Sequence, residues 1–508
     1  MKPNGFVTAS KLYDYLQCVH RPWRDVYGPQ GEQSKETNPF VELLWTRGVS
    51  HEEEAIKKLG EYLDLSDGGQ GERMERTQKA MEDGVELLYQ PVIRHEHLLG
   101  IPDLLRKQAD GSYIAVDIKS GRGQEDSAER DDESGPKLKK DYAVQLSLYT
   151  DILERTGHSN GLRQAIIYDI DHEEVLYELN SPMGVRTPMT YWEYYQQVRE
   201  EVTQLLANTK QNDPANCGSC KMCPWYVSCK AWVDERDDLS GLFSTGRSVR
   251  DVLRDDIDLT TVKEAQEINV PALLDQKRAG GKEHLRGVGK KTLEKIKRRA
   301  EILANNQSPV LYKQIELPEV SYELFFDIED DPTQGFVYMH GVYERGPDGE
   351  KFVPFVASEF TPESEEQAWR EFWEYIRSLP ENDWCLYYYS AHERTMYKAL
   401  SKQYPDVATL EDVEWLYQKS RAIDLYFDVI LKHTDWPLSS YSLKAIAQYL
   451  GFKWRDETPS GALSIEWYNR YLETKDPEIM ERILLYNEDD CKATMVIKDA
   501  LVGMKPTD

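Results

Sequence analysis

The chain lacks the long apolar run that a membrane-spanning helix needs, because no stretch of about 18 consecutive apolar residues occurs in its 508 residues. Its start, MKPNGFVTASKLYDYLQC, also lacks the apolar segment of a signal peptide, so we expect a cytoplasmic protein with no membrane partner. Basic residues are in deficit: 62 Lys and Arg face 90 Asp and Glu, for a formal net charge of -28. This excess of negative charge argues against a protein that covers nucleic acid non-specifically. It leaves room for a nuclease, which needs buried carboxylates and only a local basic track.

Cysteine is scarce as well, since seven in a chain of this length are too few for a disulfide framework. Four of them crowd into residues 217–229, CGSCKMCPWYVSC, and in a reducing compartment such crowding favours metal ligation. Apolar residues are plentiful at 40%, with 12 Trp, 31 Tyr and 12 Phe to fill cores. At about 150 residues per domain, we expect two to four folded domains and no wholesale disorder.

Charge and secondary-structure patterns divide the chain into three parts. Strand-like and helical patterns alternate in residues 1–235 and again in residues 311–508, which predicts mixed α/β domains. Residues 236–310 between them read as helical and charged. Residues 124–134, QEDSAERDDES, hold six acids and one Arg, which predicts a solvated loop. Residues 277–299 hold ten bases and two acids and form a cationic island.

A first group of acidic and basic residues surrounds the predicted strand YIAVDIK, residues 113–119. Positions two apart in a strand share a face, so we expect Asp117 and Lys119 to point the same way. Asp103, in GIPDLLRK, lies fourteen residues before Asp117. Two carboxylates can hold Mg²⁺ or Mn²⁺, and the Lys can orient a water or neutralise charge on a phosphate. This is the bare PD-(D/E)xK pattern, which by itself is also typical of a solvated strand end.

Two helical segments add to this pattern. TRGVSHEEEAI carries Arg47 and His51 at the start of a predicted helix, and YAVQLSLYTDIL carries Gln145 and Tyr149 four apart on one helical face. The ordered set resembles the RecB-family nucleases. The resemblance implies that His51, Asp103 and Asp117 bind metal and that Lys119 is catalytic. It also implies that the helix with Gln145 and Tyr149 supports the substrate and the site.

The cysteine cluster allows two interpretations. The spacing Cys220-x2-Cys223-x5-Cys229 brings three thiolates together, and the fourth ligand is either Cys217 or Cys18. Cys217 would complete a zinc knuckle, whereas Cys18 would clamp the N-terminal region around a [4Fe–4S] cluster. Spacing alone leaves both open. The iron–sulfur branch of the RecB family, with its CRISPR-associated and AddB-like members, is similar in layout. That resemblance implies a structural [4Fe–4S] cluster on Cys18, Cys220, Cys223 and Cys229, with Cys217 as a bystander.

The cationic island, LRGVGKKTLEKIKRRAEIL, is not a phosphate-binding P-loop. That motif needs G-x4-G-K-[ST], but His284 stands at the first Gly and Lys291 at the Ser or Thr, so we expect no ATP binding. A helix-hairpin-helix-like element fits better, because the Gly287–Gly289 turn can offer backbone N–H groups to a phosphate. Four cationic side chains of the following helix would bind the phosphates of nucleic acid independently of its sequence. These are Lys290, Lys291, Lys295 and Arg298. A solvated cationic helix is the equally weighted alternative.

A second group of acids lies in the C-terminal part. YELFFDIED puts Asp327 and Glu329 on one face of an apolar strand. LLYNEDDCKAT reads as a helix in which Tyr486 and Asp490, four apart, share a face. The arrangement suits two-metal phosphodiester hydrolysis, in which acids hold two Mg²⁺ and the Tyr positions the attacking water.

This segment resembles the DEDDy exonucleases of the ribonuclease H-like superfamily, in particular their YprB-like branch. The resemblance implies metal binding through the D-x-E pair, a middle Asp and the Asp of Y-x3-D. The middle position departs from the family pattern: YYSAHERTMYKAL offers Glu393 instead of Asp, and Asp424 is the fallback. A degenerate domain that only grips nucleic acid is therefore the alternative for this segment.

Together these features predict an α/β protein of three parts. We expect a PD-(D/E)xK restriction-endonuclease-like domain over 1–235, a helical helix-hairpin-helix-like linker over 236–310 and a ribonuclease H-like domain over 311–508. The predicted function is a metal-dependent nuclease with two active sites. It would act on DNA rather than RNA, on single strands or ends, in repair, recombination or nucleic-acid processing. The rival prediction is a nucleic-acid-binding scaffold with one or both sites silent.

Overall fold

The computed structural model describes residues 5–35, 38–125, 137–184, 187–210, 212–281, 283–305, 307–458 and 460–506. The predicted acidic loop at 124–134 lies outside the described residues from residue 126 onward. The chain divides into two compact units, residues 1–229 and 230–508. Both combine helices with sheets, which confirms the predicted mixed α/β class. The predicted helical segment 236–310 folds within the second unit.

A six-stranded sheet organises the first unit, in the order β11-β10-β7-β6-β3-β2. The strands are β2 (Leu63–Asp64), β3 (Leu87–Tyr89), β6 (Leu104–Lys107), β7 (Tyr113–Ile118), β10 (Gln164–Tyr168) and β11 (Glu174–Glu178). Strand β7 is central: it pairs antiparallel with β6 and parallel with β10. The parallel pair β7–β10 is connected through helix α5 (Lys140–Arg155), as parallel pairing requires a crossover.

The two faces of this sheet bury different helices. Alternate residues of β7 point to opposite faces. Ile114, Val116 and Ile118 pack with Ala55 and Ile56 of helix α3 (Pro39–Lys58). Tyr113 and Ala115 belong to the larger core, which includes the buried side of α5. Asp117 therefore shares the α5 side of the strand.

The remaining elements of the first unit surround this framework. They are β1 (Val7–Thr8), α1 (Ala9–Gln17), α2 (Arg21–Tyr27), η1 (Gln30–Glu32), α4 (Gln70–Glu82), β4 (Ile93–His95), β5 (Leu98–Gly100), β8 (Gln124–Glu125), β9 (Lys137–Leu138), β12 (Pro182–Gly184), β13 (Thr187–Thr190), α6 (Tyr191–Leu206) and η3 (Cys220–Met222). Helix α7 (Tyr226–Glu235) begins in this unit and ends in the second. Helices α1 and α6 both pack on α5. Strands β1, β5 and β4 form a small separate sheet.

A five-stranded sheet organises the second unit, in the order β17-β16-β15-β18-β19. Its strands are β15 (Tyr322–Asp331), β16 (Phe336–Gly346), β17 (Gly349–Val356), β18 (Trp384–Tyr388) and β19 (Ala422–Asp424). The first three form an antiparallel meander, and β18 and β19 continue the sheet in parallel with β15. The parallel strands are reached through α12 (Pro362–Ser378), and through α13 (His392–Gln403) with α14 (Leu410–Leu416).

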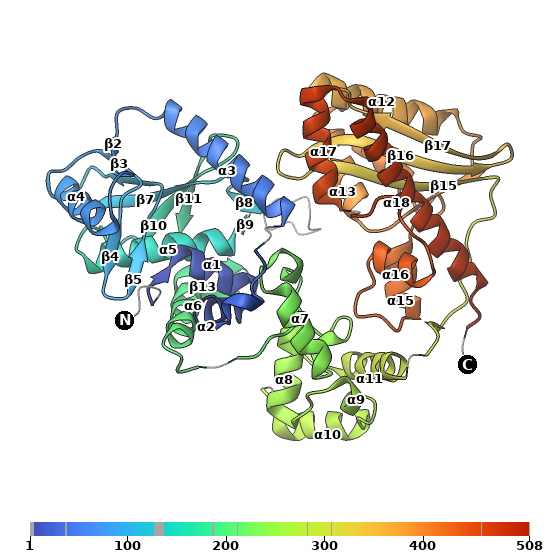
Figure 1. Ribbon diagram of the computed structural model, residues 1–508, viewed down its shortest axis with the longest axis horizontal. Helices are drawn as coiled ribbons and strands as arrows, with labels where there is room; N and C mark the ends of the chain where they lie inside the picture. Colours follow the sequence, from blue (N-terminus) through green and yellow to red (C-terminus); the bar gives the residue numbers. More distant parts are fainter. Residues whose placement is uncertain are drawn as a thin grey trace. The chain divides into compact units, whose positions relative to one another are not determined.

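Strand β15 separates an apolar face from a polar one. Leu324, Phe326 and Ile328 pack into an aromatic core with residues of α12 and α13. The alternate residues Asp327 and Glu329 face the opposite side. Helix α18 (Pro477–Gly503) packs there against β15 and β16, with α17 (Gly461–Thr474) beside it, as Figure 1 shows. The other elements are β14 (Val310–Leu311), η5 (Leu425–Ile430), α15 (Leu431–His433), β20 (Thr434–Asp435) and α16 (Leu443–Tyr449).

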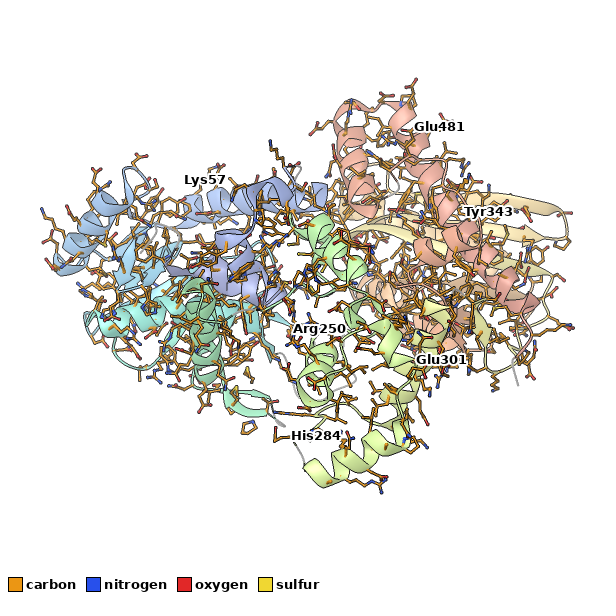
Figure 2. All side chains as sticks on the ribbon, turned by 60° about the horizontal axis from the view of Figure 1, so that its bottom comes forward. Lys57, Arg250, His284, Glu301, Tyr343 and Glu481 are labelled. Carbon is orange, nitrogen blue, oxygen red and sulfur yellow. The ribbon has the colours of Figure 1, made fainter. Side chains whose placement is uncertain are left out.

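The helical segment has a core of its own. It contains η4 (Leu239–Gly241), α8 (Arg247–Ile257), α9 (Val262–Ala265), α10 (Val270–Gly280) and α11 (Lys290–Ala304). Leucines and other aliphatic residues of these elements form one buried cluster. Arg250 of α8 is buried, and its guanidinium lies 3.7 Å from Asp238; Figure 2 marks its position. His284 lies in the turn before α11, also marked in Figure 2.

A buried ion pair joins α11 to the rest of the second unit. Arg299 Nε lies 2.6 Å from Asp435 Oδ1, and each side chain is 2% exposed. The guanidinium also lies over the stacked rings of Phe243 and Tyr441. The helical segment is thus packed onto β20 rather than loosely connected to it.

None of the helices in the described part of the chain has the length and apolar character that a membrane span requires.

Candidate active sites

Three carboxylates meet between β15 and α18. Asp327 and Glu329 project from the same face of the strand, and Asp490 faces them from the helix. One carboxylate oxygen of each lies within 4.8 Å of the others. Glu329 and Asp490 are buried, and Asp327 is half-buried. We call these residues the acidic trio. Oxygen ligands at this spacing suit a divalent cation such as Mg²⁺ or Mn²⁺.

The trio is electrostatically costly without a cation. Burial raises the pKa of Asp327 well above its usual range, and the charges of Asp490 and Glu329 raise it further. Burial, followed by the charge of Asp490, raises the pKa of Glu329 to about 8. Burial also raises the pKa of Asp490, although Lys444 lowers it. Like charges that share a low-dielectric site resist joint ionisation, and a bound cation relieves this.

Neighbouring polar side chains hold the trio in place. Asn487 Nδ2 donates hydrogen bonds to Asp327 Oδ2 at 2.8 Å and to Glu329 Oε1 at 3.3 Å. Trp454 Nε1 donates to Asp490 Oδ1 at 2.6 Å. Asn487 fits only because its neighbour is a glycine: a Cβ on Gly341 would lie 1.6 Å from Asn487 Oδ1.

Tyr486 lies beside the trio and is contacted by a lysine. Lys444 Nζ donates a hydrogen bond to Tyr486 Oη at 2.9 Å. Burial, with smaller contributions from the trio, raises the pKa of Tyr486 far above its usual range, so the phenol stays protonated. Lys444, Asn487 and Trp454 were not singled out in the sequence. Asn487 could have been found, because it lies three residues before Asp490 on the same helical face.

Glu393 and Asp424 occupy different surroundings. Glu393 begins helix α13 and is 3% exposed, and its Oε2 has no hydrogen-bond partner. Burial raises its pKa to about 8, and its charge contributes to the raised pKa of Asp327, so it lies near the trio. Asp424 instead caps η5, where its Oδ1 accepts a hydrogen bond from the Phe427 N–H at 2.8 Å. The charge of Asp424 also raises the pKa of Glu393, so the two acids lie near each other.

The first unit brings Asp103, Asp117 and Lys119 together. Asp117 is 2% exposed near the end of β7, and its Oδ1 accepts a hydrogen bond from the Asp103 N–H at 3.3 Å. Asp103 Oδ2 accepts from the Ile118 N–H at 2.7 Å. Lys119 Nζ lies 2.8 Å from Asp117 Oδ2. Burial and then Asp117 raise the pKa of Asp103 well above its usual range.

Helix α5 contributes the predicted Gln145 and Tyr149 to this site. Tyr149 is buried, and its Oη donates a hydrogen bond to the Ile101 carbonyl at 3.4 Å. Burial raises its pKa strongly, with contributions from Asp117 and Asp103, whereas a hydrogen bond with Gln145 lowers it. Both side chains therefore lie on the side of α5 that faces the two acids.

His51 lies in a different environment from the one expected. Its ring stacks on His172 at 5.2 Å between centroids. The next residue, Glu52, instead reaches the acids: its Oε1 accepts from Tyr89 Oη at 3.0 Å and from Gln90 Nε2 at 2.9 Å. Gln90 Nε2 also donates to Asp103 Oδ1 at 3.2 Å. Glu52 was not singled out in the sequence, and it is the α3 side chain linked to Asp103.

The cations of α11 are divided between the surface and the interior. Lys290 and Lys291 are exposed, as is Arg286 just before the helix. Lys295 is half-buried, and burial lowers its pKa. Arg298 lies over the ring of Tyr312 and 3.5 Å from Asp435. Two of the four predicted nucleic-acid contacts thus lie fully at the surface.

The cysteines gather at the end of α1. Cys18 caps that helix, and Cys217 Sγ lies 3.5 Å from Cys220 Sγ. A hydrogen bond with Cys18 is the largest influence on the pKa of Cys217; it lowers that pKa, but Cys220 and burial raise it overall. Burial and the charge of Cys18 raise the pKa of Cys223. Among the described residues, the acidic trio is the only set of three metal-ligating groups within 4.8 Å, so no three of the described thiols lie that close to one another.

Comparisons with known proteins match two parts of the chain to nuclease-related families. Residues 12–230 match the family model of the PD-(D/E)XK nuclease superfamily, and residues 324–502 match that of the RNase_H superfamily. No curated protein and no solved structure matches significantly. The chain therefore carries a PD-(D/E)XK nuclease superfamily domain and an RNase H superfamily domain, as predicted. Two nuclease-superfamily domains support a nuclease that acts on nucleic acid.

Proposed function

We propose that the protein is a metal-dependent nuclease with two active sites that hydrolyses single strands or ends of DNA. The observation that carries the proposal is the acidic trio, in which three carboxylates meet within 4.8 Å at a matched RNase H superfamily domain. A protein that only binds phosphate gains nothing from carboxylates held together in this way, because they repel both one another and the ligand.

The donor chemistry of both sites fits Mg²⁺ or Mn²⁺, which prefer carboxylate oxygens. Asp327, Glu329 and Asp490 would hold such an ion in the second unit, and the unpartnered Glu393 Oε2 offers a further oxygen nearby. Asp103 and Asp117 would hold one in the first unit. A bound ion supplies neutralisation of charge on the phosphate and a lower pKa for the attacking water.

In the second unit, the protein's own groups orient the reactants. Asn487 and Trp454 fix the carboxylates by hydrogen bonds, so that little reorganisation is needed when substrate binds. Tyr486 keeps its proton and donates it in a hydrogen bond to Asp490, and Lys444 fixes its hydroxyl. When substrate binds, the phenol can instead donate to the attacking water. On the resemblance to DEDDy exonucleases, we propose that this site trims 3′ ends.

In the first unit, Lys119 is the cationic group. Burial lowers its pKa, but Asp117 and Asp103 raise it overall, so the amine stays charged. It can donate to a phosphate oxygen while it remains close to Asp117. Gln145 and Tyr149 support the acids from α5. On the resemblance to RecB-like nucleases, we propose a role in DNA repair, recombination or nucleic-acid processing.

Labelled single-stranded DNA and RNA, incubated with purified protein and Mn²⁺, test the proposal. Asp117→Ala and Asp490→Ala should each remove a different set of products, because each breaks one acid cluster. Glu53→Ala, an exposed acid on α3, serves as the control and should change neither set. If wild type and both Asp variants give the same products, the two-site proposal fails. If no strand is cut, the rival binding scaffold is favoured.

We also propose a structural [4Fe–4S] cluster on Cys18, Cys220, Cys223 and Cys229. Cys18 at the end of α1 lies near the later cysteines, because its thiol acts on the pKa values of Cys220 and Cys223. A bound cluster would clamp α1 to the segment before α7. Fresh protein should be brown, with a broad absorbance near ~400 nm that Cys18→Ala abolishes. A colourless protein with one zinc, sensitive to Cys217→Ala but not to Cys18→Ala, would contradict this.

A further inference from the structure

The stripe of polar residues on α5 continues past Gln145 toward the surface. Tyr142, Gln145 and Tyr149 stand three and four residues apart, so they share one side of the helix. Tyr149 lies at the inner end, near Asp117 and Asp103. Tyr142 lies at the outer end, about two turns from Tyr149, and is half-buried. Its ring is approached by two lysines: Lys119 Nζ at 5.7 Å and Lys139 Nζ at 5.0 Å from the centroid.

A second tyrosine lies near Tyr142 from another helix. Tyr13 of α1 is 43% exposed, and α1 packs directly on α5. The charge of Lys119 acts on Tyr13, which puts that ring within electrostatic reach of the catalytic lysine. The nearest acid on the same helix, Asp14, is paired with Arg21 at 3.0 Å. Asp141, beside Tyr142 in the first turn of α5, has a larger effect than Asp14 on the pKa of Tyr13.

The loop after β7 passes close to Tyr142. A Cβ on Gly121 would lie 3.3 Å from Tyr142 Oη and 3.9 Å from Lys139 Nζ. Lys119 and Gly121 belong to this same loop, only two residues apart. Both lysines thus approach the Tyr142 ring, Tyr13 acts on the pKa of Tyr142 from α1, and Lys119 is paired with Asp117. We call Tyr13, Tyr142 and Lys139 the tyrosine wall.

We propose that the tyrosine wall binds an unpaired nucleotide of the strand that the first site cuts, with a base on the tyrosine rings and a phosphate at Lys139. This rests on the proposed nuclease function of the first unit. Aromatic rings beside cations are the combination by which proteins hold single strands without reading sequence. Base faces inside a duplex are already stacked, so the wall selects single-stranded over paired substrate at this site.

Binding in EDTA tests the wall without cleavage. The full-length protein carries Asp490→Ala, Lys290→Ala and Lys291→Ala, so that the second site and the exposed α11 lysines contribute little. Fluorescence anisotropy is measured with a labelled oligothymidine and with a strand of equal length made of abasic nucleotides. Tyr13→Leu and Tyr142→Leu should each weaken oligothymidine binding about tenfold, and abasic binding less than about twofold. Tyr449→Leu, an exposed tyrosine of the second unit, is the matched control.

Further variants separate stacking from charge and folding. Tyr142→Phe keeps the ring and should bind as tightly as the parent protein. Lys139→Met should weaken both strands and reduce the salt dependence by about one phosphate contact. The proposal for the tyrosine wall is wrong if the Leu variants bind oligothymidine normally, or if they lose affinity equally for oligothymidine and for the abasic strand.

The wall and the nuclease proposal fail in different ways. With Mg²⁺ added, Asp117-dependent cleavage in the Asp490→Ala protein reports on the nuclease proposal alone. If that cleavage persists while the Leu variants leave both binding and KM unchanged, only the wall is wrong. If cleavage is absent but the Leu variants lose oligothymidine selectively, the wall binds nucleotides and the nuclease proposal for this unit is wrong.

Discussion

Lys444 Nζ lies 2.9 Å from Tyr486 Oη and 4.8 Å from the centroid of the same ring, so one ammonium contacts both the hydroxyl and the π face of the tyrosine. The same charge lowers the pKa values of Asp327, Glu329 and Asp490. Lys444 belongs to α16, which is separate in sequence from both β15 and α18. It therefore ties a third element to the acidic trio.

Lys444→Met should lower the kcat of the Asp490-dependent activity by roughly 10- to 150-fold, because a hydrogen bond to a charged group contributes about 1.5–3 kcal/mol. KM should change less, since the lysine acts on Tyr486 rather than on distant parts of the strand. Lys444→Arg should recover part of the rate. Lys402→Met, the same exchange at an exposed position on α13, is the control. A Lys444→Met protein with normal kcat would show that the contact is incidental.

Gly341→Ala should damage the second site through Asn487. The new methyl group would lie 1.6 Å from Asn487 Oδ1 and 2.8 Å from its Cγ, so the amide must move and lose its hydrogen bonds to Asp327 and Glu329. We expect a free energy of unfolding lower by about 1–3 kcal/mol and a reduced Asp490-dependent rate. Gly461→Ala, where the added methyl meets nothing within 4 Å, should leave both unchanged. Equal behaviour of the two variants would count against the close packing.

The metal-free protein should lose stability as the pH rises from about 4.5 to about 8. The pKa of Glu329 rises from its ordinary 4.5 to about 8 on folding, so the folded chain binds more protons than the unfolded chain in that window. The free energy of unfolding then falls with increasing pH. Mg²⁺ should reverse much of the loss near pH 8, because it pairs with the ionised trio.

Thermal unfolding in EDTA and in Mg²⁺, at about pH 5.5 and about pH 8, measures this effect. Glu329→Gln should flatten the pH dependence in EDTA and reduce the gain from Mg²⁺. The same slope in wild type and Glu329→Gln would mean that the trio does not set the pH dependence.

Arg299→Met should destabilise the second unit by about 1.5–3 kcal/mol, because it removes the hydrogen bond that buried Asp435 accepts from Arg299, while Tyr312 and Arg298 remain beside the carboxylate. It also removes the cation from the Phe243–Tyr441 stack. Arg278→Met breaks an exposed pair with Asp275 and should cost less than about 1 kcal/mol. Urea unfolding followed by circular dichroism compares the two. Similar midpoints for both variants would be inconsistent with a buried ion pair.

Local periodicity explains what the sequence could predict. Asp327 and Glu329 alternate along one strand, and Tyr486 and Asp490 are one helical turn apart, so each pair was expected on one face. The same reasoning applies to Asp117 with Lys119 and to Gln145 with Tyr149. Each of these expectations depends only on spacing within one element. The structure keeps three of the pairs on one element, whereas Lys119 follows the end of β7 and reaches Asp117 from the loop.

Contacts between residues of different helices and strands could not be predicted from these patterns. Consecutive residues in a helix differ in direction by about 100°, so the packing of α3 decides whether His51 or Glu52 turns toward Asp103. No sequence pattern around α3 fixes that rotation. Lys444 and Trp454 meet the trio only because α16 and the segment after it pack beside α18. For α11, charge alone did not distinguish Lys290 at the surface from Arg298 beside Asp435.

Helix α7, Tyr226–Glu235, contains both Cys229, the last residue of the first unit, and Lys230, the first of the second. The Cys229 N–H donates to the Trp225 carbonyl at 2.9 Å, so the helical turn itself orients this thiol. Dividing the polypeptide between Cys229 and Lys230 would leave two fragments of α7 that are too short to stay helical in water. To study the two units separately, the gene is best divided after α7 ends at Glu235, so that the helical turn that carries Cys229 stays whole.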